Sequence, residues 1–393
     1  MKEGWIYKKL GEVFASINNG ANIKQIKGAS GIPITRIETL SNDMFNRDRM
    51  GYANIGDISP YISYVLNEGD ILMSHINSMK FLGRAVAYVK KNNETIIHGM
   101  NLLRLVPTSE VFSPFMVYQF QTSIFRNQIQ QISHQSVNQA SFNITNLKGL
   151  NVLVPPLSEQ QSIVDYLDSV FAKIDAMNAN AEKALNEAKA LFQASLKEML
   201  GSKEGWEENT LGDVCAITSL LVNPAEEQYK KLLHVGGANI ISESGELVDL
   251  KTAEEENLIS GKFLFDTKDV LYNKIRPYLM KVARPDFSGL CSADMYPLKH
   301  KDCITRDFLY YVLITKDFTD YAILNSGRAG MPKVNRQVIF AYSFSLPSIN
   351  EQQSIVNCLD SLKTKVDRLQ KNYNKISQEC DALKQAILRQ VFE

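Results

Sequence analysis

Apolar residues recur in alternating steps of four and three along two long stretches of the chain, residues 158–200 and 348–393. Neither stretch contains glycine or proline. This spacing puts the apolar side chains on one stripe of a helix, as at the a and d positions of a coiled coil. The pattern predicts two helices of roughly 43 residues, each about 65 Å long. The predicted helix–helix packing positions are Ile163, Leu167, Val170, Ile174, Leu191, Ile355, Leu359, Leu362, Val366, Leu383 and Ile387.

Each predicted helix follows a segment with short, β-branched or aromatic runs that Gly, Asn or Pro bound. Each segment also contains one aromatic-rich stretch with helical spacing, residues 114–129 and 306–324. Short strands with one helix and many loops predict an α+β domain in each half. The predicted strands are residues 69–74, 84–89, 102–106 and 151–154 in the first segment, and 269–273 and 342–346 in the second.

The chain contains an internal duplication. Glu-Gln-Gln-Ser-Ile-Val at residues 159–164 recurs unchanged at 351–356, and both copies closely follow a proline. Glu-Gly-Trp at residues 3–5 recurs at 204–206 in the same order, and Asn143 and Asn335 each lie sixteen residues before the shared Glu-Gln-Gln. The repeated unit is therefore a mixed domain followed by a long helix, far larger than a solenoid repeat.

These observations predict a mixed domain at residues 1–157, a helix at 158–200, a second mixed domain at 201–347 and a C-terminal helix at 348–393. The two helices are expected to pack against each other as an antiparallel coiled coil that separates the two domains with pseudo-two-fold symmetry. The alternative is that each helix forms a coiled coil with another chain. It is disfavoured because one chain already supplies both stripes.

Composition is that of an ordinary globular protein, with 45% apolar and 22% charged residues. Net charge is zero, but residues 1–157 carry 15 Lys and Arg against 10 Asp and Glu, whereas residues 201–347 carry 17 against 20. Proteins that bind DNA unaided are usually more basic. Five cysteines without a Cys-x-x-Cys pair predict free thiols, and no apolar run would span a membrane. We expect a cytoplasmic protein.

The order of domain, Pro-Pro-Leu-x-Glu-Gln, helix, domain, Leu-Pro-x-x-x-Glu-Gln and helix resembles the specificity subunit of type I restriction-modification systems. The resemblance covers essentially the whole chain, with the motifs at residues 155–160 and 346–352. It implies that each domain recognises one half of a bipartite, asymmetric site in double-stranded DNA. It also implies that the helices bind two methyltransferase subunits and, through that complex, restriction subunits. S-adenosylmethionine, ATP and Mg²⁺ are then expected on the partners, with no cofactor in this chain.

The residues themselves predict no chemistry. The Asn/Asp-Pro-Pro-Tyr/Phe segment of an amino-methyltransferase, a glycine-rich loop after a strand and a phosphate-binding loop are all missing from the sequence. The five histidines lack the spacing of metal ligands. We therefore predict a non-enzymatic subunit with neither catalytic residues nor a metal.

Four polar loops, two in each domain, are the candidates for DNA contact. Their side chains are of the types that bind base edges and phosphates, and the loops occupy equivalent places in the two halves. Each side chain alone is as compatible with an ordinary surface loop, but the four loops together favour DNA. The candidates are His75, Asn77, Lys80, Arg84, His134, Gln135, Asn138, Asn143, Asn273, Lys274, Arg276, Tyr278, Arg328, Lys333, Asn335 and Arg336.

Three other functions compete with this interpretation. The chain could serve a fused methyltransferase–nuclease of a type II-like system, which separate modification and restriction genes nearby would exclude. It could be a protein–protein scaffold, which predicts no sequence-specific protection of DNA. A hydrolase is disfavoured because no nucleophile and base pair is identifiable.

The modular interpretation predicts the result of a domain exchange. Replacing residues 1–150 by the first domain of another family member should change one half of the recognised site and leave the other half unchanged. Mapping adenine methylation in cells that express the chimera tests this. A change in both halves would contradict independent recognition by the two domains.

Overall fold

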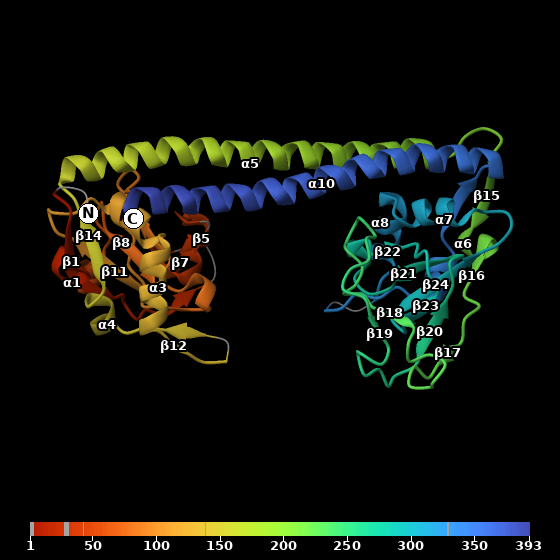
Figure 1. Ribbon diagram of the computed structural model, residues 1–393, viewed down its shortest axis with the longest axis horizontal. Helices are drawn as coiled ribbons and strands as arrows, with labels where there is room; N and C mark the ends of the chain where they lie inside the picture. Colours follow the sequence, from red (N-terminus) through yellow and green to blue (C-terminus); the bar gives the residue numbers. More distant parts are fainter. Residues whose placement is uncertain (1–3, 27–30, 42, 138, 328–329) are drawn as a thin grey trace. The chain divides into compact units, whose positions relative to one another are not determined.

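A computed structural model of the chain describes residues 4–26, 31–41, 43–137, 139–327 and 330–393 (Figure 1). The chain divides into two compact units. The first unit contains Met1–Ala179 and Ile376–Glu393, and the second contains Asn180–Lys375. Each unit therefore combines one mixed domain with parts of both long helices.

Two helices of 44 residues each, α5 (Leu157–Leu200) and α10 (Ile349–Phe392), confirm the prediction of long helices. In the first unit, α5 packs against the end of α10, where Lys384 Nζ lies 2.5 Å from Asp175 Oδ1. In the second unit, the end of α5 and the beginning of α10 contribute Leu196 and Leu359 to one core. The helices are thus antiparallel in both units, as predicted.

The predicted packing positions form two series that each repeat every seven residues. The series with Leu167 and Leu359 is buried more fully than the series with Leu191 and Leu383. Leu191 and Leu383 are 64% and 48% exposed, so their predicted packing is wrong. The remaining predicted positions are buried, or partly buried against the cores of their units: Ile163, Leu167, Val170, Ile174, Ile355, Leu359, Leu362, Val366 and Ile387.

The error has a simple origin in helix geometry. In a heptad pattern the second apolar position follows the first by either three or four residues. Both choices repeat every seven residues, so the period alone does not distinguish them. In α5 the buried side chains of the second position are Val164, Phe171, Leu185 and Phe192. Each lies one residue after a predicted position of the series that contains Ile163, Val170 and Leu191. In α10 the corresponding positions hold largely polar, half-buried side chains. Because these residues are polar, the apolar pattern of the sequence does not identify the half-buried positions of α10.

The mixed domain of the first unit is built from short strands and helices. They are β1 (Ile6–Lys9), α1 (Leu10–Val13), β2 (Phe14–Asn19), β3 (Gln25–Ile26), β4 (Ile32–Ile34), β5 (Leu40–Ser41), β6 (Met44–Phe45), β7 (Gly51–Ala53), β8 (Ile71–Ser74), β9 (Ile76–Asn77), β10 (Ala85–Ala87), β11 (Leu102–Pro107), α2 (Ser113–Phe120), α3 (Ser123–Ile132), β12 (His134–Gln135), β13 (Ala140–Ser141), α4 (Ile144–Lys148) and β14 (Asn151–Val154).

The second unit contains a related set of elements. They are β15 (Glu207–Thr210), α6 (Leu211–Val214), β16 (Cys215–Ala216), β17 (Leu221–Val222), β18 (Leu233–Val235), β19 (Lys251–Thr252), β20 (Lys262–Phe265), β21 (Asp269–Asn273), β22 (Val282–Ala283), β23 (Gly289–Ser292), β24 (Met295–His300), α7 (Arg306–Leu313), α8 (Lys316–Leu324), α9 (Arg336–Phe340) and β25 (Ser343–Leu346).

The duplication is visible in the central sheets. The first unit has the antiparallel order β10-β8-β11-β2, and the second has β22-β21-β24-β16. Successive residues of a strand point to opposite faces of a sheet. Accordingly, Ile71 of β8 joins the main core while Leu72 joins a smaller cluster, and Val270 and Leu271 of β21 divide in the same way. Both faces of each central strand are therefore covered.

Each predicted aromatic-rich helix is in fact two helices, α2 and α3 in the first unit and α7 and α8 in the second. A threonine begins the second helix of each pair. The Thr122 hydroxyl accepts from the Phe125 amide at 3.3 Å, and that of Thr315 from Phe318 at 3.2 Å. A hydroxyl acceptor of this kind is a preferred N-terminal cap, and it marks the break that helical spacing alone does not show.

The corrected helix register predicts a large difference between two adjacent substitutions. Phe192→Ala should lower the free energy of unfolding of the second unit by about 3–5 kcal/mol, because it opens a cavity beside Tyr311. Leu191→Ala should change it by less than about 0.5 kcal/mol, because Leu191 is exposed. Urea titration in a Trp5→Phe background would report this unit through Trp206 fluorescence. Equal effects of the two substitutions would contradict the register.

Candidate nucleic-acid interface

In the first unit, the two predicted loops meet in one small sheet. Strand β9 pairs with β13, with Asn77 opposite Ala140, and β13 pairs with β12, with His134 opposite Ser141. The amide of Phe142 also donates to the carbonyl of His75 at 3.2 Å. Segments some 60 residues apart in sequence thus form one continuous surface.

The second unit brings together the equivalent pair of loops. The Arg276 amide donates to the Pro332 carbonyl at 2.8 Å, and the Val334 amide donates to the Lys274 carbonyl at 3.0 Å. Ile275 and Lys333 form an isolated antiparallel bridge between these bonds. The sequence placed these loops at corresponding positions, and the structure joins them through the backbone in both units.

The first-unit surface presents mostly uncharged polar groups. His134 and Gln135 are exposed on β12, and Asn77 donates from Nδ2 to the Ser74 hydroxyl at 3.3 Å. Burial lowers the pKa of His75 below its ordinary value, so its imidazole is neutral at pH 7. Its Nδ1 is buried without a hydrogen-bond partner among the described residues. Lys80 is exposed, with its ammonium 5.5 Å from the centre of the Phe81 ring.

Arg84 is already paired within the protein. Its Nε lies 3.1 Å from Asp43 Oδ1, and its guanidinium lies 4.6 Å from the centre of the Phe81 ring. Asp43 therefore offsets part of the positive charge of Arg84. Its contact with DNA stays a prediction.

The second-unit surface is built around a strained turn. Arg276 and Met280 both have left-handed backbone conformations, with φ of 51° and 46°. Such conformations are costly for residues other than glycine, and they cluster at sites where a side chain must be presented in one direction. Arg276 is exposed, and the Tyr278 side chain between the two strained residues is 51% exposed. The turn therefore presents the side chains of Arg276 and Tyr278 to solvent.

Two residues of the same loop were wrongly predicted to face DNA. Lys274 is 8% exposed and donates to the Ala293 carbonyl at 2.5 Å, and burial lowers the pKa of its ammonium. Asn273 is 7% exposed and donates to the Ile275 carbonyl at 3.3 Å. Buried polar groups need such partners, so these side chains shape the turn and do not reach solvent.

The matched asparagines of the duplication are helix caps. Asn143 Oδ1 accepts from the Asn146 amide at 2.7 Å at the start of α4, and Asn335 Oδ1 accepts from the Val338 amide at 2.9 Å at the start of α9. The cap accounts for their equivalent positions in the two repeats. Their contact with DNA stays a prediction, and Asn138 and Arg328 lie outside the described residues.

Arg336 and Lys333 complete the second-unit surface. Arg336 is exposed at the first position of α9, with its guanidinium 5.1 Å from the Phe340 ring centre. Lys333 Nζ lies 3.6 Å from Asp294 Oδ1, in a surface ion pair of the kind that contributes little to stability. Together with Arg276, these cations form the local basic cluster of a domain that is acidic as a whole.

Sequence reasoning missed a polar cavity in the first unit. It has a volume of about 310 Å³, and its lining includes Asn22, Gln25, Arg36 and Asn101, all side chains that bind base edges. No repeat or periodic pattern marks these residues, so only the fold brings them together. No cluster of His, Cys, Asp or Glu among the described residues is suited to hold a metal ion. The described part of the chain also has no helix long and apolar enough to cross a membrane.

Comparison with known proteins decides the family. The model of the type I restriction modification DNA specificity domain matches twice, at residues 2–187 and 203–378. The chain belongs to this family. The resemblance seen in the sequence is thereby confirmed. Each matched copy of the specificity domain continues into a long helix, so the family domain coincides with the duplicated unit of domain and helix.

Individual relatives cover most of the chain. A Methanocaldococcus jannaschii protein provisionally named as the type I restriction enzyme MjaX specificity subunit is 26% identical, over 95% of this chain and 90% of its own length. The Escherichia coli type I restriction enzyme EcoDI specificity subunit is 27% identical, over 81% of this chain and 80% of its own length. A solved structure from a study of complex assembly and conformational transition of the type I R-M system has the same fold. Its TM-score is 0.72 and its identity 16%, and the match covers 100% of this chain and 98% of that one.

The geometry of the second specificity domain predicts which cations contact DNA. Arg276→Ala and Arg336→Ala should each weaken binding of the assembled complex to its specific site by about 1–3 kcal/mol, because both residues are exposed, on the joined loops and at the start of α9. Fluorescence anisotropy with labelled duplex measures this. Lys268→Ala is the matched control, since Lys268 is exposed at the opposite end of β21. Unchanged affinity in both arginine variants would remove them from the interface.

Proposed function

We propose that the chain is the sequence-reading subunit of a type I restriction-modification complex, and that it recognises a bipartite, asymmetric site in double-stranded DNA. One observation carries the proposal. A single chain holds two copies of the DNA specificity domain, and each copy joins the same two polar loops through its backbone. Two reading surfaces in one chain fit two half-sites separated by a gap.

The difference between the two loop surfaces supports an asymmetric site. The first surface is a short sheet that carries His134, Gln135 and Asn77. The second is a strained turn that carries Arg276 and Tyr278. Amides favour adenine edges and arginine favours guanine edges, so side chains this different would select different bases. We propose that each surface reads one half-site.

The long helices are the proposed binding surface for partner subunits. Apolar side chains on them stay exposed in this chain, among them Met177 (60%), Leu191 (64%), Leu369 (38%) and Leu383 (48%). These lie at heptad positions beside the buried stripe, where a further helix would pack. Two methyltransferase subunits on the two repeats are the arrangement that the duplication supports, with restriction subunits joining through them.

We propose that this chain performs no chemistry itself. S-adenosylmethionine would bind the methyltransferase subunits, and ATP with Mg²⁺ would bind the restriction subunits. The proposal is supported by the sequence motifs, since the segments that bind those cofactors in known enzymes do not occur in this chain. A type II-like fused partner would need the same recognition surfaces and is distinguished by the partner gene.

A methylation map of the host genome tests the proposal. Deleting this gene should abolish adenine methylation at one gapped motif and leave other methylated motifs unchanged, because the partner methyltransferase would lose its sequence reader. Single-molecule sequencing of the deletion strain and of a strain with the gene restored measures this. An unchanged map in a strain that expresses an active partner methyltransferase would contradict the proposed function.

A further inference from the structure

The first glutamine of the repeated Glu-Gln-Gln is the most deeply buried polar residue of each long helix. Gln160 and Gln352 have no exposed surface, although each is only the fourth residue of its helix. Glutamine is mostly an exposed residue type. A fully buried amide at the same place in both repeats needs a set of partners there.

In the first unit, Gln160 forms three hydrogen bonds to backbone groups of two separate segments. Its Nε2 donates to the Pro155 carbonyl at 2.8 Å and to the Glu110 carbonyl at 2.9 Å, and its Oε1 accepts from the Phe112 amide at 2.8 Å. Pro155 precedes α5, whereas Glu110 and Phe112 precede α2. One side chain therefore ties the long helix to the domain that it follows.

The second unit contains the same three bonds. Gln352 Nε2 donates to the carbonyls of Pro347 and Cys303, both at 2.9 Å, and its Oε1 accepts from the Thr305 amide at 2.8 Å. These segments precede α10 and α7. Because every partner is a backbone atom, the arrangement does not depend on which side chains the two domains carry, and it persists although the domains have diverged.

Neighbouring residues reinforce each attachment. In the first unit, Trp5 Nε1 donates to Glu159 Oε1 at 2.8 Å, and the Tyr118 hydroxyl donates to Asp168. In the second unit, the pKa of Glu351 is lowered by hydrogen bonds from Ser348 and by a further bond from Trp206. The repeated Glu-Gly-Trp and Glu-Gln-Gln motifs thus meet in each unit, which explains why both recur together.

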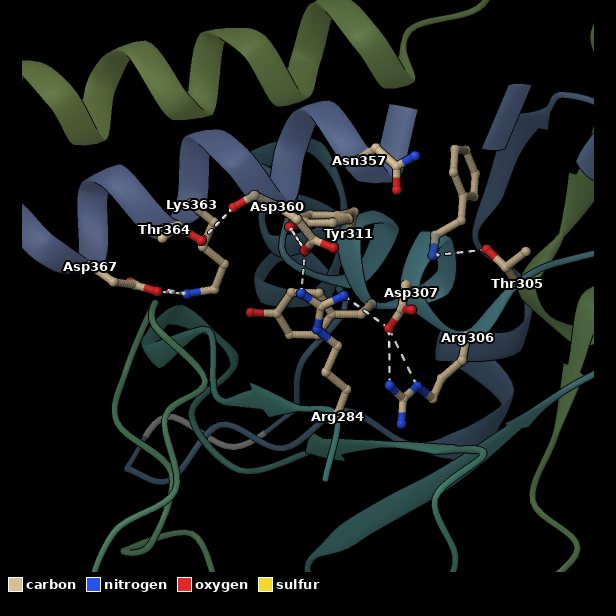
Figure 2. Close-up of polar contacts among 12 residues, drawn as sticks. Arg284, Thr305, Arg306, Asp307, Tyr311, Asn357, Asp360, Lys363, Thr364 and Asp367 are labelled. Carbon is tan, nitrogen blue, oxygen red and sulfur yellow. Dashed lines mark hydrogen bonds and ion pairs between the residues drawn. The ribbon is translucent and has the colours of Figure 1, made fainter. Parts of the chain in front are cut away.

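Figure 2 shows the equivalent of the tyrosine bond in the second unit, where it is part of a larger network. The Tyr311 hydroxyl donates to Asp360 Oδ1 of α10 at 2.5 Å. The Arg284 guanidinium lies between Asp360 and Asp307, with Nη1 2.9 Å from Asp307 Oδ1. Asp168 and Asp360 both lie eight residues after the buried glutamine, so each helix is held to its domain at two points.

We propose that Gln160 and Gln352 are positioning residues that determine the number of base pairs between the two half-sites. This inference rests on the proposed function. A domain that could tilt on its helix would place its loops at variable distances along the duplex, where adjacent base pairs are only about 3.4 Å apart. In the part of the chain that the structure describes, the hydrogen bonds of the two glutamines do not reach the candidate DNA loops. They would therefore act on spacing and not on the choice of bases.

The adjacent glutamines supply a matched control. Gln161 and Gln353 have the same side chain but are exposed, and each donates within its own helix, to Asp165 at 2.8 Å and to Asn357 at 3.0 Å. Replacing them by alanine removes the same number of atoms without loosening a domain. Comparing the alanine variants of the buried and the exposed glutamines therefore separates loss of the bonds between helix and domain from any general effect of losing an amide.

The test uses the complex assembled with the host's methyltransferase subunit and a plasmid library. The library keeps both native half-sites, as found in the methylation map, and varies the gap from two base pairs shorter to two longer. In Gln160→Ala and Gln352→Ala, the ratio of methylation at a gap changed by one base pair to methylation at the native gap should rise about tenfold. A tenfold change corresponds to about 1.4 kcal/mol, which is about the net contribution of one hydrogen bond. Gln161→Ala and Gln353→Ala should match the unmodified chain.

The outcomes are separable. An unchanged gap preference in the buried-glutamine variants, or an equal change in the exposed-glutamine controls, would overturn the inference. If the alanine variants fail to assemble, Tyr118→Phe and Tyr311→Phe remove only one hydroxyl each and should relax the gap preference in the same direction; an unchanged preference in both would also overturn it. If the unmodified chain directs methylation to no gapped motif, the proposed function itself fails.

Discussion

An apolar stripe along a 44-residue helix cannot be covered by one domain of this size, and the whole fold follows from that constraint. Each helix extends beyond its own unit into the other. Ile387 and Phe392 of α10 enter the core of the first unit, and Phe192 and Leu196 of α5 enter that of the second. Each repeat therefore completes its core with the end of the other repeat's helix, and a single domain with its own helix would leave both incomplete.

The same attachment is used twice, while the surfaces it supports differ. Gln160 and Gln352 repeat three bonds each, and the central sheets repeat the same strand order. In contrast, the joined loops are a small sheet in one unit and a strained turn at Arg276 in the other. Bonds to backbone atoms tolerate divergence of side chains, so a shared frame can carry two unrelated recognition surfaces.

The sequence predicts this frame better than it predicts the interface. The strict period of seven and the repeated hexapeptide indicate the helices and their antiparallel pairing, because both signals are local and occur twice. In α10, Leu383 is wrongly predicted because the half-buried positions of the neighbouring series hold polar residues, Lys363, Gln370 and Lys384. Lys274 fails for the converse reason: it resembles a DNA-binding lysine, but only the fold shows that it is buried against Tyr296.

Charge connects the fold to the need for partners. Binding to phosphates gains affinity from the release of counterions, which requires cations that are free to replace them. In the described loops, Arg84 is paired with Asp43, Lys333 lies near Asp294 and Lys274 is buried, so much of the apparent positive charge is already neutralised. Among the candidate cations that the structure describes, Lys80, Arg276 and Arg336 remain exposed. Zero net charge and few free cations on these loops are therefore consistent with the proposal that partner subunits supply most phosphate contacts.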